Sequence, residues 1–269
     1  MLAEMGVRVW APRAEASAVA EVPAPVPEAP APAHPPAEAR APAAPAARAT
    51  PSAAPERPVA VPEAPSSPLA AAERLRPAGV AQMDWPALQA AVAGCEACGL
   101  CKTRRNTVFG VGDTQTDWMI VGEAPGENED LQGEPFVGAA GQLLDNMLRA
   151  VGRSRAGEGA KGAYIANVLK CRPPANRNPQ PQEVAQCEPY LARQVALVRP
   201  KIIVAMGRFA VQSLLHTEEP IGRLRGRVHR YEGVPVIVTY HPAYLLRTPA
   251  DKAKAWEDLC LAMETAEGL

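Results

Sequence analysis

The sequence of 269 residues has no long apolar run and almost no net charge. No stretch approaches the roughly 20 apolar residues that a membrane-spanning helix needs. The first residues also lack the compact apolar region and cleavage site of a secretory signal. Lys and Arg number 28 against 29 Asp and Glu, so the overall charge favours no class of partner. We therefore expect a cytoplasmic protein that does not bind membranes.

Proline is unevenly distributed along the chain. Residues 1–80 hold 17 of the 30 prolines, interleaved with alanine. Alanine buries little surface and proline lacks a backbone donor, so this segment cannot offset its ordering entropy. We predict that 1–80 is a disordered tether and that 81–269 forms one folded domain with a single core.

The folded part alternates predicted strands and helices. The strands are apolar throughout, and the helices between them are amphipathic, which indicates a largely parallel sheet covered on both faces. We predict an α/β fold with three α/β/α layers and a mainly parallel central sheet. The predicted strands are 117–122, 163–169, 201–207, 227–233 and 234–240, and the predicted helices are 85–94, 140–152, 181–200, 208–216 and 249–267.

Polar and glycine-rich segments follow four of these strands. Ligands bind beyond the carboxyl ends of the strands in such sheets. The segments, read here as loops, are GEAPGENED (122–130), KCRPPANRNP (170–179), GRFA (207–210) and HPAYLLR (241–247). Basic stretches at 101–105, 170–177 and 223–230 are typical of separate parts of a phosphate-facing surface. The sequence therefore predicts a site at this edge of the sheet.

The cysteines are spaced as ligands rather than as disulfide partners. CEACGLC places three cysteines within residues 95–101, and Cys171 and Cys187 follow at a distance. A CxxC pair with two distant cysteines is the pattern of a thiolate-bound metal centre, and zinc and an iron–sulfur cluster both fit it. Spacing alone leaves open which of the three neighbouring cysteines are ligands.

Several long motifs in one order resemble the family-4 uracil-DNA glycosylases, the iron–sulfur members of the uracil-DNA glycosylase superfamily. They are CEACGLC, IVGEAPGENED, PFVGAAGQLL, NVLKCRPPANRNP, IIVAMG and HPAYLLR, and they extend from about Cys95 to Arg247. The resemblance implies an enzyme that hydrolyses the N-glycosidic bond of deoxyuridine turned out of DNA. Its products are uracil and an abasic site, the first intermediate of base-excision repair.

The resemblance also implies which residues bind the cofactor. The family pattern assigns a [4Fe–4S] cluster to Cys95, Cys98, Cys171 and Cys187, with zinc as the alternative. Cys101 falls where the family needs no ligand and could substitute if the loop winds differently. The expected role of the cluster is structural.

Three side chains match the base-binding positions of the family. Phe136 is expected to stack on the uracil ring. Asn167 is expected to read the base, its carbonyl accepting N3–H and its amide donating to O4. His241 is expected to donate a hydrogen bond to O2 of the departing uracil.

The turn after the first strand is expected to contact the sugar and activate water. Ala124 stands where a better-known branch has aspartate, and Gly126 stands where that branch has an aromatic residue that excludes thymine. We expect Glu123 to activate water, with Glu129 second and the phosphates of the substrate third. Glu129 could also form the wall that excludes thymine, and Pro125 lies within the same substrate-binding turn.

The segment after His241 is expected to contact DNA. In the superfamily this segment inserts into the duplex, so Leu245 or Leu246 would fill the gap left by the flipped base and Arg247 would bind phosphate. We expect a monomer, whose 1–80 tether could contact a repair or replication protein. Two other hypotheses stay open here: a non-catalytic DNA-binding domain that assists a polymerase, and a zinc-stabilised glycosylase for another deaminated base such as hypoxanthine.

Overall fold

A five-stranded sheet lies at the centre of the structure, a computed structural model that describes residues 78–268. Nearly all of the predicted tether lies outside these residues, so its disorder and its partner stay predictions, as does the domain boundary at residue 81. The strands are β1 Trp118–Gly122, β2 Tyr164–Asn167, β3 Ile202–Met206, β4 Val228–Tyr231 and β5 Val234–Thr239, in the order β2-β1-β3-β5-β4. Only β4 runs antiparallel, and it pairs with β5 through the turn at Gly233.

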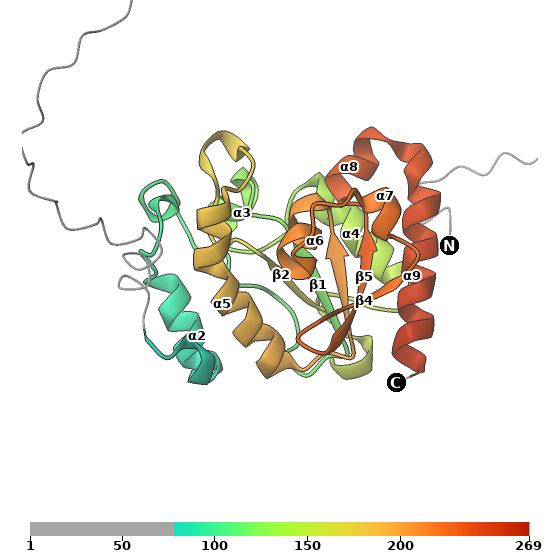
Figure 1. The fold of residues 1–269 in the computed structure, drawn as a ribbon, viewed down its shortest axis with the longest axis horizontal. Helices are drawn as coiled ribbons and strands as arrows, with labels where there is room; N and C mark the ends of the chain where they lie inside the picture. Colours follow the sequence, from blue (N-terminus) through green and yellow to red (C-terminus); the bar gives the residue numbers. More distant parts are fainter. Residues whose placement is uncertain (1–77, 269) are drawn as a thin grey trace, which may run out of the picture. The chain divides into compact units, whose positions relative to one another are not determined.

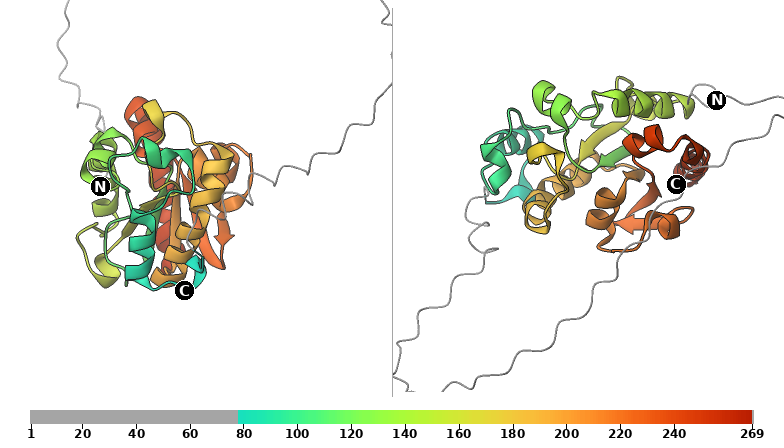
Figure 2. Two further views of the ribbon diagram at one scale, coloured as in Figure 1. Left: turned by 90° about the vertical axis from the view of Figure 1, so that its left-hand side faces the viewer. Right: turned by 90° about the horizontal axis from the view of Figure 1, so that it is seen from above.

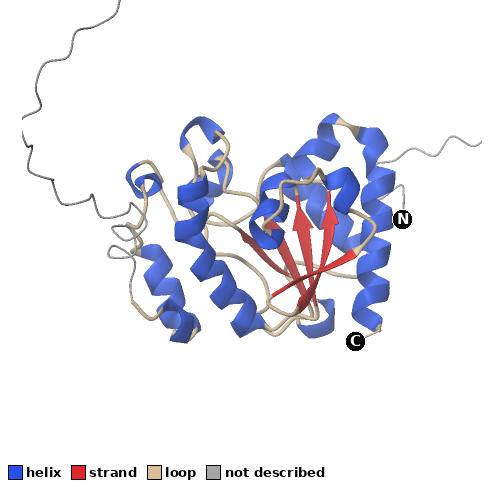
Figure 3. Ribbon diagram, viewed as in Figure 1, coloured by secondary structure: helices blue, strands red, loops and turns tan. Residues whose placement is uncertain are grey.

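Helices cover both faces of this sheet (Figures 1 and 3). They are α2 Trp85–Ala93, α3 Glu127–Gln132, α4 Ala139–Ala150, α5 Pro181–Val198, α6 Arg208–Leu215, α7 Ile221–Leu224, α8 Pro242–Arg247 and α9 Lys252–Glu267. In the view from above in Figure 2, α4 and α6 lie on opposite sides of the strands. Helix α2 packs on α5 rather than over the centre of the sheet. None of the helices described here combines the length and apolarity of a bilayer-spanning segment. The predicted three-layer α/β architecture is confirmed.

The strands divide their side chains between two cores. Trp118 and Ile120 point to the core shared with α4 and α9, while Met119 and Val121 point to the core shared with α5 and α6. Successive side chains of a strand face opposite sides, so a strand buried on both faces has no polar position. This explains why WMIVG reads as a continuous apolar run.

Local signals set the helix ends. The Asp84 carboxylate accepts a hydrogen bond of 3.0 Å from the Ala87 N–H, and Pro86 occupies the first turn of α2. Two segments read as loops contain short helices instead, α3 after β1 and α8 after β5. Each is only six residues long, too short to show helical periodicity in the sequence.

Candidate active site

A cavity of about 470 Å³ lies beyond the carboxyl ends of β1, β2 and β5. This volume is within the range of small-ligand sites, and its position follows the rule for parallel sheets. Its lining residues are Glu123, Ala124, Pro125, Gly126, Glu129, Phe136, Ala140, Asn167, Pro173, Asn176, Arg177, His241, Ala243, Tyr244 and Arg247. All eight predicted catalytic and substrate-binding residues are therefore brought together, along with Arg247.

Phe136 is held in a strained backbone conformation at this cavity. Its φ is 54°, a left-handed value that costs a residue other than glycine roughly 1–2 kcal/mol. Its ring is buried and stacks beside the imidazole of His241, with centroids 5.3 Å apart and planes 24° apart. A Cβ added to Gly141 of α4 would lie 1.6 Å from the Phe136 carbonyl oxygen, so only glycine lets α4 approach this loop.

Asn167 ends β2 and is paired in register with Gly122 at the end of β1. Its residue surface is 2 % exposed, and its side-chain amide has no hydrogen-bond partner among residues 78–268. Because this side chain lines the cavity, its amide donor and carbonyl acceptor are available to a ligand there. The buried ammonium of Lys170 donates to the Asn167 carbonyl oxygen at 2.7 Å and fixes the backbone there.

His241 is the N-cap of α8, and this role sets its tautomer. Its Nδ1 accepts a hydrogen bond of 3.1 Å from the Ala243 N–H, so in the neutral ring the proton is on Nε2. Burial, followed by the nearby Arg247 cation, lowers the pKa of His241 to about 4. Around neutral pH the imidazole is therefore uncharged and presents one N–H donor.

Glu123 follows β1 directly and faces the cavity. Burial raises the pKa of its carboxyl to about 7, against a smaller opposing effect of Arg208. No hydrogen bond to its carboxylate forms within the described part of the chain. A carboxyl group with this pKa can exchange a proton near neutrality, as a general base requires.

Glu129, the second predicted base, already accepts hydrogen bonds from the backbone. Its two carboxylate oxygens accept hydrogen bonds of 3.0 Å from the Gly126 and Val137 N–H groups. A Cβ on Gly126 would lie 2.7 Å from this carboxylate, so the glycine is needed for the contact. Glu129 therefore joins the turn after β1 to the Phe136 loop, and this arrangement favours Glu123 as the base.

The two leucines predicted to contact DNA have different environments. Leu245 is 0 % exposed and belongs to the core under α8, so it cannot enter a duplex unless the helix is displaced. Leu246 is 45 % exposed. Of the two leucines named from the sequence, only Leu246 is free to contact DNA, because successive helix positions point in directions about 100° apart.

Sequence reasoning missed several residues of the cavity. Pro173, Asn176 and Arg177 reach it from the segment after β2, and Tyr244 reaches it from α8. Arg177 also forms an ion pair with Glu183 of α5, with nitrogen and oxygen 2.5 Å apart. The signal for this segment was present, since 170–177 is one of the basic stretches, but no pattern showed which of its side chains turn inward.

The four predicted cluster ligands lie close to one another. Electrostatic interactions link Cys98 with Cys95, Cys171 with both of these, and Cys187 with Cys98 and Cys171. Burial raises the pKa of Cys171 to about 11 and of Cys187 to about 12, so these thiols are protonated when no metal is bound. A bound metal removes such protons.

Two cations accompany these thiols. The Arg104 guanidinium donates to the Cys171 sulfur at 3.1 Å and to the Cys95 carbonyl at 2.8 Å. Lys170 is fully buried, which lowers its pKa to about 7, and the neighbouring Cys187 and Cys171 oppose this shift and favour its charged form. Cations fit a centre that carries negative charge when its four thiolates are formed, so the donor set suits the predicted group. Arg104 thus faces the cysteines rather than a phosphate surface.

Cys101 interacts electrostatically with Cys98 and with Arg104. In residues 78–268, no three His, Cys, Asp or Glu side chains converge closely enough to hold a single metal ion.

Comparison with known proteins identifies the family of the chain. Residues 109–260 match the family described as the uracil DNA glycosylase superfamily. The type-4 uracil-DNA glycosylase of Archaeoglobus fulgidus is 47% identical over 166 residues, which cover 59% of this chain and 81% of the relative. That of Pyrobaculum aerophilum is 42% identical over 187 residues, covering 66% and 93%. That of Thermotoga maritima is 42% identical over 165 residues, covering 61% and 83%. The chain therefore belongs to the uracil DNA glycosylase superfamily.

Proposed function

We propose that this cavity receives a uracil turned out of DNA and that the chain hydrolyses the bond between this base and its deoxyribose. The chain is a uracil-DNA glycosylase, a hydrolase of DNA repair, by its family and relatives. One observation carries the proposal: an aromatic ring, an unpaired amide and a neutral imidazole line the same cavity. The roles of individual residues below are part of the proposal.

Asn167 would select the base. Its carbonyl accepts N3–H of uracil and its amide donates to O4, while Phe136 stacks on the ring, a contact worth about 1–3 kcal/mol. Cytosine presents the opposite donors and acceptors at these positions. A cytosine in the cavity would leave buried groups unpaired at about 1–3 kcal/mol each. Glu129 and Gly126 would line the side of the cavity that receives carbon 5.

His241 would stabilise the departing base. As the bond breaks, negative charge develops on uracil O2, and the Nε2–H donor stabilises it by roughly 2.7–4 kcal/mol. The low pKa suits this role, because the imidazole stays neutral near pH 7. Its Nδ1 then remains free to accept the Ala243 N–H while Nε2–H donates to the base.

Glu123 would activate the water that attacks C1′. Its carboxylate accepts the water proton, and its negative charge stabilises the cationic sugar of the transition state. The bond from C1′ to the base breaks with its electrons moving to uracil, and the water oxygen forms the new bond to C1′.

Two residues of α8 would contact the DNA. Leu246 is exposed and would fill the space left by the flipped base, and Arg247 would bind a phosphate. The finer prediction that the substrate is uracil within DNA, rather than free nucleoside, depends on these contacts.

The cysteine group would bind a [4Fe–4S] cluster through Cys95, Cys98, Cys171 and Cys187. Such a cluster would cross-link the segment after β2 to α5 and to the chain before β1. The segment after β2 carries Arg177 into the cavity, so its order supports the site. None of the six cysteines, all within residues 78–268, forms a disulfide, which fits a reducing, cytoplasmic compartment.

The proposal is tested by incubating the purified chain with single- and double-stranded oligonucleotides that contain one uracil, and measuring uracil release. We expect release from the wild type and about 10²–10³-fold slower release by His241→Ala. His216→Ala is the matched control, because His216 pairs with Glu188 away from the cavity. A wild type that binds these oligonucleotides without releasing uracil would support the accessory-domain hypothesis instead, and release of hypoxanthine but not uracil would support the other glycosylase.

A further inference from the structure

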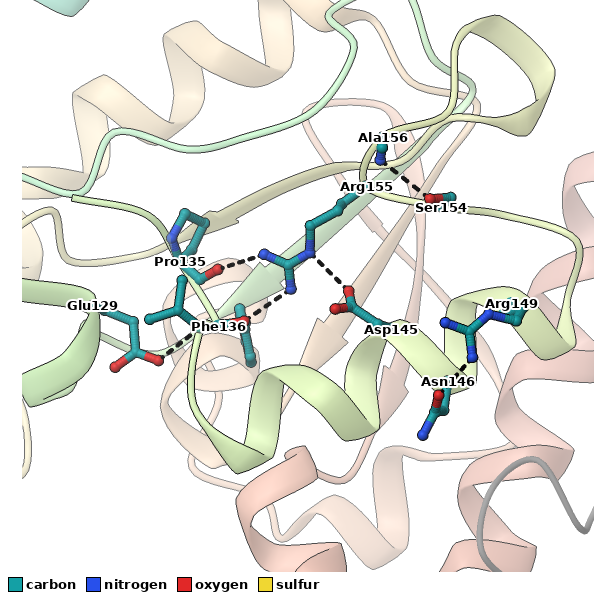
Figure 4. Close-up of polar contacts among 10 residues, drawn as sticks. Glu129, Pro135, Phe136, Asp145, Asn146, Arg149, Ser154, Arg155 and Ala156 are labelled. Carbon is teal, nitrogen blue, oxygen red and sulfur yellow. Dashed lines mark hydrogen bonds and ion pairs between the residues drawn. The ribbon is translucent and has the colours of Figure 1, made fainter. Parts of the chain in front are cut away.

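Arg155 holds the backbone of the Phe136 loop from outside the cavity. It follows α4 in the chain and reaches back along that helix (Figure 4). Its Nη1 donates to the Pro135 carbonyl at 3.0 Å and its Nη2 donates to the Phe136 carbonyl at 2.8 Å. Both ends of the guanidinium fork are therefore bound to consecutive carbonyl groups, a geometry that lysine cannot reproduce.

A carboxylate of α4 orients this guanidinium. The Arg155 Nε donates to Asp145 at 2.7 Å, so three nitrogens of the side chain have defined partners. The Arg155 side chain is mostly buried and the Asp145 side chain is half-buried, which protects the pair from water more than an exposed ion pair is protected.

The peptide bond after Phe136 is fixed at both of its polar groups. Arg155 binds its carbonyl oxygen and Glu129 binds its N–H, from opposite sides of the loop (Figure 4). The left-handed backbone of Phe136 is one that this residue type avoids in an unrestrained chain. Such conformations persist only where the surroundings over-determine them, and these two side chains supply that restraint.

We propose that Arg155 is a positioning residue for catalysis, which acts by holding Phe136 in the orientation that receives the base. The proposal depends on the base-stacking role given to Phe136 above. Arg155 does not line the cavity and touches no reacting atom, so its whole effect on the reaction passes through the ring.

A double-mutant cycle tests the proposal on the full chain. We compare kcat and KM for uracil release by the wild type, Arg155→Met, Phe136→Leu and the double variant, and record the Tm of each. Arg155→Met keeps the aliphatic stem and removes the donors. We expect it to reduce kcat/KM by up to about 100-fold, because small misplacements of binding groups have effects of this size.

Comparing Arg155→Met in the wild-type chain and in the Phe136→Leu chain distinguishes a positioning role of Arg155 from a general effect on stability. If Arg155 acts through the ring, Arg155→Met changes kcat/KM by less than about twofold when Phe136 is already leucine. Equal losses in both backgrounds, or no loss in the wild-type background, would overturn the proposal. A Phe136→Leu variant with wild-type activity would remove the stacking role of Phe136 itself, and the Arg155 proposal with it.

Two further variants keep the test informative if Arg155→Met does not fold. Arg155→Lys retains the ion pair with Asp145 but reaches only one carbonyl, and we expect a loss of about tenfold, between the wild type and Arg155→Met. Arg149→Met is the control, since Arg149 lies on α4, is exposed and, within residues 78–268, bonds only Asn146. If Arg155→Lys keeps the wild-type kcat/KM, or if Arg149→Met loses as much kcat/KM as the Arg155 variants, the assignment is contradicted.

Discussion

Substituting Gly122 by alanine should disable the site while leaving the fold intact. Gly122 ends β1 between the two groups proposed to hold the base. An added Cβ would lie 2.4 Å from Asn167 Oδ1 and 2.5 Å from Phe136 Cζ. Real Cβ atoms do not approach other atoms this closely, so both side chains must move by several tenths of an ångström or more.

The loss of stability and activity in Gly122→Ala depends on how far the Asn167 and Phe136 side chains are displaced. Overpacking of a well-packed interior costs about 1–3 kcal/mol of stability. In a domain of about 190 residues that corresponds to a Tm lower by roughly 2–12 °C. The effect on catalysis should be larger, because the amide and the ring are displaced together and misplacement by about 1 Å can reduce rates about 100-fold.

The assay is single-turnover uracil release by Gly122→Ala, with Tm measured in parallel. Gly222→Ala is the matched control, because nothing lies within 4 Å of its added Cβ and its φ is not left-handed. We expect Gly222→Ala to match the wild type in both measurements. If Gly122→Ala releases uracil at the wild-type rate, Asn167 and Phe136 do not position the base and the reasoning fails.

Three further predictions concern the base, the cluster and the DNA contact. Burial raises the pKa of Glu123 to about 7, so with Glu123 as the proposed base activity should fall as the pH drops below 7, and Glu123→Gln should lose about 10²–10⁴-fold in rate together with this pH dependence. Purified protein should contain about four irons per chain, and Cys171→Ser should lose them while Cys101→Ser retains them. Leu246→Ala should slow release from duplex DNA by about tenfold and leave release from single strands little changed, because only a duplex has a gap to fill.

Each of these has an outcome that contradicts it. An acidic limb that survives unchanged in Glu123→Gln would assign water activation to another group. The pKa of His241 is about 4, so His241 does not produce a limb near pH 7. Full iron content in Cys171→Ser, or a zinc-loaded active wild type, would refute the cluster. Leu131→Ala, which alters a leucine of similar exposure on α3, is the control for Leu246→Ala, and equal effects of the two would refute insertion.

The sequence predicts the fold well because burial on both sides of a parallel sheet is visible in the chain. WMIVG and IIVAM have no polar position. Such runs separated by amphipathic helices are compatible with few folds other than a parallel sheet covered by helices on both faces. The short helices α3 and α8 were not predicted. They are held by caps and tertiary packing, through Glu129 and His241, and neither leaves a periodic pattern.

The site was predicted as a set of residues but not as a set of contacts. The strand ends brought Glu123, Asn167 and His241 together as expected. The direction of a side chain within a six-residue helix is not readable from the sequence, so Leu245 and Leu246 were not separated. Arg155 was also missed, because it acts on backbone carbonyls, and no residue pattern records that kind of partner.

The most direct test of the central claim is a crystal structure of the chain with uracil and DNA that contains an abasic site. The account predicts uracil in the cavity beyond β1, with its ring against Phe136, N3 and O4 bonded to the Asn167 amide, and O2 within hydrogen-bond distance of His241 Nε2. Uracil bound elsewhere, or bound with Asn167 and His241 turned away from it, would contradict the account.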